Sequence, residues 1–109
     1  MAYAVYSQVY LAIALDEEEK IFKIGETTNV ARRQKQLKDF EICLWADLTT
    51  DSKADRLFVE SYLRIKILEY DDIRLLGYDY FSYTIEKVYK EILDNFEKWV
   101  EEAIEILPT

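Results

Sequence analysis

The sequence contains no histidine and a single cysteine, Cys43. Without histidine, a Ser-His or Cys-His nucleophile pair is excluded, and so in practice is a zinc site of the usual Cys/His kind. Within this sequence the lone cysteine has no disulfide partner, and we expect it to be a small buried hydrophobe. Low cysteine usage fits a reducing compartment, so we expect a cytoplasmic protein.

Glycine and proline are also scarce, with two and one among 109 residues, which argues against long irregular loops. No repeat or linker interrupts the chain, so residues 1–109 are expected to form a single domain. The longest apolar run is MAYAVYSQVYLAIAL at residues 1–15, followed directly by DEEE. It lacks a basic leader and is too short for a membrane span, so we expect neither a signal peptide nor a membrane partner.

Acidic residues dominate, with 22 Asp and Glu against 14 Lys and Arg and a net charge of −8. This balance argues against a general nucleic-acid binder, whose footprint is usually basic. The charges are unevenly spread, however. Residues 20–38 carry six basic side chains and one acid, whereas residues 85–106 carry seven acids and three lysines. We therefore expect a basic face at residues 20–38, available to DNA, and an acidic face at the C-terminus.

Alternation of apolar side chains predicts a hairpin at the N-terminus. Residues 3–15 alternate between mainly aliphatic odd positions and small or tyrosine even positions, which is the period of a strand. Residues 21–25 form a second strand-like stretch after the polar turn DEEE. With those four residues as the loop, Tyr10 pairs with Gly25 and shares a face with Lys23.

Helical periods follow the hairpin. Capping side chains precede helices expected at residues 30–39 and 53–68, and Thr84 is expected to cap a helix ending near residue 107. The last helix has a regular apolar stripe that predicts packing against the core. Its length also leaves open a homodimer seam or a protein partner on this helix.

A third strand is expected at residues 41–49, and a short strand-like stretch, GYDYF, lies at the end of a loop at 71–81. The third strand is expected to present Ile42, Leu44, Ala46 and Leu48 on one face, with Trp45 in the core. This order predicts an α+β domain: a small, mostly antiparallel three-stranded sheet flanked by helices, with a long C-terminal helix.

The stretch KIGETTNVARRQKQL, residues 23–37, places Arg33 on the helical face of Val30 and Leu37, where a purely structural helix would be apolar. With QVYLA around Tyr10 and RLFVESYL around Glu60, this stretch resembles the GIY-YIG nuclease superfamily. The similarity is to its phage and bacterial branch in which KIG replaces YIG. Arg33 falls eight residues after Gly25, the spacing of the family arginine, and GYDYF resembles a later family segment.

The resemblance covers roughly residues 5–82, so we expect a GIY-YIG-like core at 1–82 and an amphipathic helix outside it at 83–109. It implies a metal-dependent DNA endonuclease that hydrolyses phosphodiester bonds. Tyr10 would position or deprotonate the attacking water, and Arg33 would hold phosphate oxygens with its planar fork. Glu60 would be the ligand of Mg²⁺ or Mn²⁺, hard ions that suit carboxylate and water.

The sequence departs from the family at several positions. Lys23 replaces the second tyrosine, where it would act either as a phosphate-binding charge or, with a lowered pKa, as a base. Gln8 replaces the leading glycine of GIY. Leu37 and Arg64 stand where many members carry histidine, and no late asparagine is evident.

These departures leave other functions open. One is a catalytically degenerate relative that binds DNA or a protein through the old site and needs no metal. Another is an inhibitor or DNA mimic that presents the carboxylates of residues 86–105. A plain α+β domain of unrelated role is a third. In that case Tyr10 would be a packing residue, Arg33 would extend from the helix edge, and Lys23 and Glu60 would be solvated.

Overall fold

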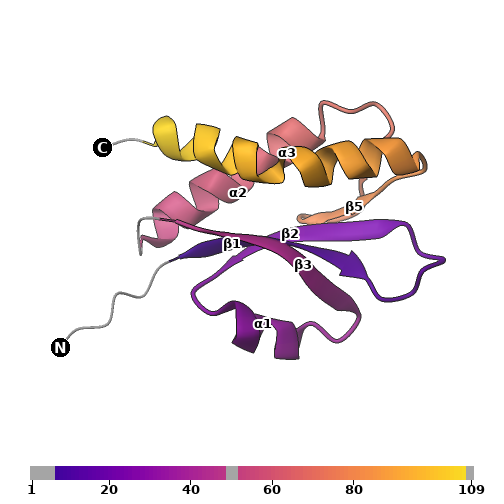
Figure 1. Ribbon diagram of the computed structural model, residues 1–109, viewed down its shortest axis with the longest axis horizontal. Helices are drawn as coiled ribbons and strands as arrows, with labels where there is room; N and C mark the ends of the chain where they lie inside the picture. The colour runs from indigo at the N-terminus through magenta and orange to yellow at the C-terminus, as the bar shows by residue number, and fades with distance from the viewer. Residues whose placement is uncertain (1–6, 49–51, 108–109) are drawn as a thin grey trace.

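The computed structural model describes residues 7–48 and 52–107. Two long helices cover one face of a sheet, and a short helix lies on the opposite face (Figure 1). The elements in chain order are β1 (Gln8–Ala14), β2 (Ile21–Thr27), α1 (Val30–Gln36), β3 (Phe40–Asp47), α2 (Lys53–Ile67), β4 (Arg74–Leu75), β5 (Tyr80–Ser82) and α3 (Glu86–Glu105). The expected α+β class and the long C-terminal helix are confirmed.

The sheet has five strands in the order β3-β1-β2-β5-β4, and every neighbouring pair is antiparallel. The prediction of three strands was therefore wrong. The additional strands have two and three residues, too few to show a period of two in the sequence. They form because β5 pairs with the first half of β2, from Ile21 to Lys23.

The expected hairpin register is confirmed, since Tyr10 pairs with Gly25 and Ala12 with Lys23. Strand β2 continues beyond Gly25 to Thr27, because Val9 and Gln8 supply partners for its last two residues. The beginning of the expected first strand, at residues 3–6, lies outside the described residues.

Strand β3 contains an irregularity that the sequence pattern did not reveal. Leu11 pairs with Leu44, but its neighbour Ala12 pairs with Ile42, so Cys43 is an extra residue in a β-bulge. Paired residues share a face and successive residues of β1 alternate, so Ile42 lies on the opposite face from Leu44. The prediction that these two share a face was wrong for this reason.

Two further burial predictions on β3 were wrong. Trp45, expected in the core, is 54% exposed, and Cys43, expected to be buried, is an exposed thiol. Strand β3 lies at the edge of the sheet, where Trp45 pairs with Tyr10 and so lies on the opposite face from Leu44, and Cys43 is the extra residue of the bulge.

The hydrophobic core lies between the sheet and the two long helices. Phe22 and Phe81 are fully buried and stacked, with ring centroids 5.2 Å apart. The apolar stripe of α3 packs into this core as expected, because Ile92, Phe96 and Val100 are each at most 3% exposed. Among the described residues, no helix is long and apolar enough to cross a membrane.

Helix ends differ in detail from the sequence patterns. Helix α1 stops at Gln36, three residues early, because Leu37 is extended at φ −93° and ψ 90°. The predicted cap of α3 by Thr84 was wrong, since the cap position is Ile85 and no side chain of its own caps it. Instead the carboxylate of Asp72 accepts hydrogen bonds from the backbone N–H groups of Thr84 and Ile85. A carboxylate distant in sequence thus satisfies donors that a local cap would serve.

Candidate active site

Tyr10 and Gly25 form the floor of the candidate site. They pair across the hairpin, and the Tyr10 ring lies directly over the glycine. A Cβ on residue 25 would be 2.5 Å from Tyr10 Cζ, a separation that packed atoms do not reach. Tyr10 is only 1% exposed, so its ring has little room to move aside. Gly25 is therefore required because the tyrosine occupies the space of a side chain.

Lys23 joins this floor from β2. Its Nζ donates to the Tyr10 hydroxyl oxygen at 3.3 Å and lies 3.4 Å from Asp79 Oδ2. It also lies 5.2 Å from the ring centroid of Tyr80. Burial disfavours the ammonium form, but Tyr10 and Asp79 outweigh burial, and the pKa of Lys23 is raised above its ordinary value. Because its pKa is raised, Lys23 stays protonated. Of the two roles expected for it, this favours the phosphate-binding charge over the base.

Tyr10 and Lys23 lie on the face of the sheet that α1 covers. Tyr10 pairs with Trp45 as well as with Gly25, and Trp45 lines a cavity together with Val30 and Gln34 of α1. Paired residues share a face, so the Tyr10 ring is on the α1 side, away from the core between the sheet and the long helices.

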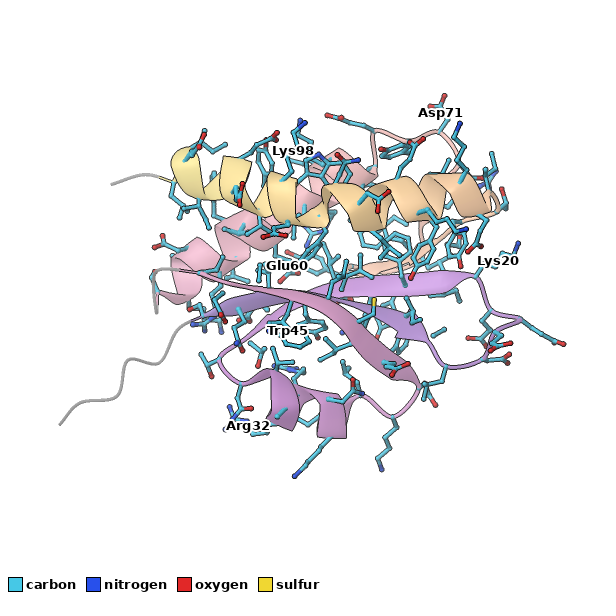
Figure 2. The ribbon with its side chains drawn as sticks, in the orientation of Figure 1. Lys20, Arg32, Trp45, Glu60, Asp71 and Lys98 are labelled. Atoms are coloured by element: carbon cyan, nitrogen blue, oxygen red, sulfur yellow. The ribbon has the colours of Figure 1, made fainter. Side chains whose placement is uncertain are left out.

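Glu60 approaches from the opposite layer. It lies on α2, between the helices and the sheet in Figure 2, and is 6% exposed. Its Oε1 accepts a hydrogen bond from Arg64 Nη2 at 3.3 Å, one turn further along the helix. Burial raises the pKa of the Glu60 carboxyl, Arg64 opposes that shift, and Asp79 reinforces it. Lys23 also acts on this carboxyl, so the two predicted site residues share one electrostatic environment.

The two layers meet at an open stretch of sheet edge. Strand β5 pairs with β2 only as far as Lys23, and the Asp79 carbonyl accepts one last bond from the Ile24 N–H. Beyond that point no strand in the described residues borders β2 on this side. Helix α2 packs against β2, and Lys23 on β2 acts electrostatically on Glu60 of α2 around this edge.

Arg33 is the predicted site residue that this structure does not join to the others. In residues 7–48 and 52–107 it makes no hydrogen bond or ion pair with Tyr10, Lys23 or Glu60. It is half-buried on α1, and its Nε is a buried donor without a protein acceptor. Such a donor is normally satisfied, by water where no protein group accepts from it.

The sequence analysis did not predict two charged members of this cluster. Asp79 is the ion-pair partner of Lys23, and Arg64 is the ion-pair partner of Glu60. Asp79 lies within GYDYF, a stretch whose aromatic residues indicate a strand and give no signal of a charged site residue. Arg64 was noted only as a replacement for histidine. Its position four residues after Glu60 on one helix was a usable signal of pairing. The Arg64 guanidinium also lies 4.1 Å from the ring centroid of the exposed Tyr78, and its Nε is a second buried donor without an acceptor.

The donor set suits a metal ion only in a limited way. No group of three or more Cys, Asp or Glu residues able to enclose a metal occurs in the described chain. Arg64 engages Oε1 of Glu60, and within the same residues Oε2 has no hydrogen-bond partner. A single free carboxylate oxygen fits Mg²⁺ or Mn²⁺ held mostly by water and substrate phosphate, as is usual for Mg²⁺.

Replacing Gly25 by alanine is expected to destabilise the protein by about 1–3 kcal/mol, because the new methyl group overlaps the buried Tyr10 ring. Gly77→Ala is the matched control, since a Cβ there would lie 3.6 Å from Tyr80, an ordinary contact. Urea unfolding of both variants measures the difference. Equal stability of the two would contradict the close approach of Tyr10 to Gly25.

Replacing Glu60 by glutamine is expected to make the protein more stable at neutral pH. A carboxyl whose pKa is raised on folding binds its proton more tightly in the folded state, so its ionisation lowers the free energy of unfolding as pH rises. Glutamine removes this effect and still accepts a hydrogen bond from Arg64. The gain should be present at pH 7 and vanish below the ordinary glutamate pKa, in urea unfolding measured across pH. The exposed Glu69→Gln is the matched control for the loss of one carboxylate, and a loss of stability at pH 7 in Glu60→Gln would contradict the assignment.

Comparison with protein families gives one match, to the T5orf172 domain, over residues 7–105. Comparison with curated proteins found no match, and neither did comparison with solved structures. The matched region extends from β1 to the end of α3 and includes Tyr10, Lys23 and Glu60. Because the match spans nearly the whole chain, this protein belongs to the T5orf172 domain family.

Proposed function

We propose that this chain is a metal-dependent DNA endonuclease domain of the GIY-YIG type, which hydrolyses phosphodiester bonds. The observation that carries the proposal is the Lys23–Tyr10 pair beside the open end of the β2–β5 pairing, with Glu60 on α2 near enough for Lys23 to act on its carboxyl. Membership of the T5orf172 family, a phage-associated domain, is consistent with a phage-type nuclease or DNA-binding domain.

Glu60 would hold Mg²⁺ or Mn²⁺ through its free oxygen. When bound, such an ion supplies Lewis-acid stabilisation of a phosphoryl oxygen. The raised pKa of Glu60 implies that a nearby cation is favourable, because positive charge promotes the ionised carboxylate that burial opposes. Arg64 already supplies part of that charge.

Lys23 and Tyr10 would act on the substrate as a pair. The ammonium group donates to the Tyr10 oxygen, so the hydroxyl hydrogen of Tyr10 is left to donate to a water or a phosphate oxygen. Lys23 keeps further N–H donors for the phosphate, whose negative charge would compete with Asp79. The unpaired Nε of Arg33 is a further donor on the α1 side of the sheet.

Supercoiled plasmid and branched DNA should be cut in the presence of Mg²⁺ or Mn²⁺, and Glu60→Gln should lower the rate by about 100-fold or more. The loss follows because removing charge stabilisation worth a few kcal/mol costs tenfold for each 1.36 kcal/mol. Glu69→Gln, an exposed glutamate just after α2, should cut like the parent protein. Cleavage that survives in Glu60→Gln would remove this residue from the mechanism. No cleavage by folded parent protein with either metal would reject the endonuclease proposal.

The second candidate is a DNA-binding relative that does not cleave. It is favoured by the internal pairing of the two charged site residues, since Lys23 is paired with Asp79 and Glu60 with Arg64. A basic surface remains available in this case. Arg32, Lys35 and Lys38 are exposed, and Arg32 projects from α1 on the side of the sheet opposite the long helices (Figure 2).

DNA affinity, measured by fluorescence anisotropy in EDTA, is expected to fall as salt rises if residues 20–38 contact phosphates. The double variant Arg32→Ala/Lys35→Ala should bind more weakly, and the slope of log K against log salt should become shallower by about two. Lys87→Ala/Lys98→Ala on α3 removes the same charge from exposed positions on the acidic side and should leave the slope unchanged. Equal effects of both pairs would show that net charge, not this face, governs binding.

A further inference from the structure

The outer edge of β3 is covered along only half of its length. The side chain of Gln34, from α1, accepts a hydrogen bond from the Ile42 N–H at 2.7 Å and donates to the Phe40 carbonyl at 2.9 Å. One amide side chain thus makes the two bonds that a neighbouring strand would make. These bonds also show that Ile42 and Phe40 turn their peptide groups away from β1.

The second half of this edge is open. After the bulge, the Leu48 N–H donates to the Ser7 carbonyl on the β1 side at 2.7 Å. Peptide groups of alternate residues point to opposite sides of a strand, so those of Trp45 and Asp47 point outward. Both residues are exposed, and β3 has no strand beyond it in the described part of the sheet. Unpaired edge groups of this kind form a template for another strand.

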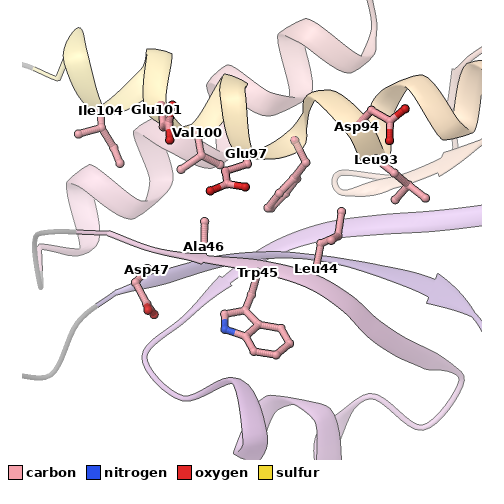
Figure 3. Close-up of a pocket in the computed structure, with 11 residues that line it drawn as sticks. Leu44, Trp45, Ala46, Asp47, Leu93, Asp94, Glu97, Val100, Glu101 and Ile104 are labelled. Atoms are coloured by element: carbon pink, nitrogen blue, oxygen red, sulfur yellow. The ribbon is translucent and has the colours of Figure 1, made fainter.

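A groove runs beside this open edge, between β3 and α3 (Figure 3). Its volume is about 370 Å³. Leu44 and Ala46 of β3 rise into it, and Val100 and Ile104 of α3 face them. Exposed carboxylates of α3 border this apolar floor, from Asp94, Glu97 and Glu101, whereas the Asp47 side chain of β3 points to the opposite face with Trp45. Among the residues that the structure describes, no lysine or arginine lines the groove.

We propose that the open edge of β3 is a docking site for an extended segment of a protein partner that carries lysine or arginine at alternate positions. The segment would pair with the peptide groups of Trp45 and Asp47 as an added strand. Its basic side chains would lie in the groove, with their methylene stems over Leu44 and Ala46 and their charges at Glu97 and Glu101. Its other side chains would pack beside the exposed indole of Trp45, which points to the opposite face in Figure 3.

Charge complementarity identifies the occupant. The three carboxylates of α3 repel nucleic acid, so a phosphate backbone is not suited to this groove. They also disfavour an acidic or neutral strand relative to a basic one, which gives specificity among protein segments. The groove that would hold the basic side chains lies on the long-helix side of the sheet, and it is separate from the basic residues of α1. It is therefore independent of the proposed nuclease activity.

The test uses an eight-residue peptide of alternating lysine and valine, titrated into the full chain by NMR with amide hydrogen exchange. The amides of Trp45 and Asp47 should exchange at least about tenfold more slowly when the peptide is saturating, because they become hydrogen-bonded. A second peptide has the same lysines, with proline at every valine position, so it keeps the charge and loses backbone donors. It should leave this exchange unchanged. Equal protection by both peptides, or by neither, would overturn strand addition.

Matched variants separate the groove from general acidity. Glu97→Lys/Glu101→Lys should raise the Kd of the lysine–valine peptide at least about tenfold. Glu86→Lys/Glu105→Lys makes the same charge change on exposed positions of α3 outside the groove and should alter it less than about threefold. The Glu97→Lys/Glu101→Lys substitutions should change DNA cleavage or DNA binding less than they change the Kd of the peptide. Equal effects of the two pairs on the peptide would show that net charge alone attracts it.

Discussion

The position of the Tyr10 ring over Gly25 organises the rest of the site. The hairpin register sets these residues opposite each other, and only a residue without a side chain leaves room for the ring. With the ring in that place, its hydroxyl reaches Lys23 on the next position of the same face. Lys23 then reaches Asp79, which is held beside β2 by the bond from the Ile24 N–H. A shift of one residue in the pairing of β1 with β2 would turn the Tyr10 side chain toward the core, and each of these contacts would be lost.

Buried charges in this cluster are balanced in pairs. Lys23 is held charged by Tyr10 and Asp79, while Glu60 is held near Arg64 in surroundings that oppose its ionisation. A carboxyl kept in such a place weakens the fold at neutral pH, which is common where a group is retained for function rather than stability.

The sheet separates two surfaces of opposite charge. On the α1 side lie exposed basic residues such as Arg32 and Lys35, and on the α3 side lie carboxylates such as Glu97 and Glu101. A net charge of −8 therefore describes neither face. The two proposed partners, a nucleic acid and a basic protein segment, would each be attracted to one side and repelled from the other.

The sequence alone determined the hairpin and its register, since alternation fixes the face of every strand residue and the polar turn fixes the pairing. It also determined α2 and the core-facing stripe of α3, because an apolar period of 3.6 residues that continues over several turns indicates an amphipathic helix and not a strand. Tertiary structure alone decided the bulge at Cys43, the pairing of β5 with β2, the cap from Asp72 and the proximity of Glu60 to Lys23. The last three features join residues of separate elements, and the bulge adds one residue to a strand. None of them changes the local pattern of apolar residues from which secondary structure is predicted.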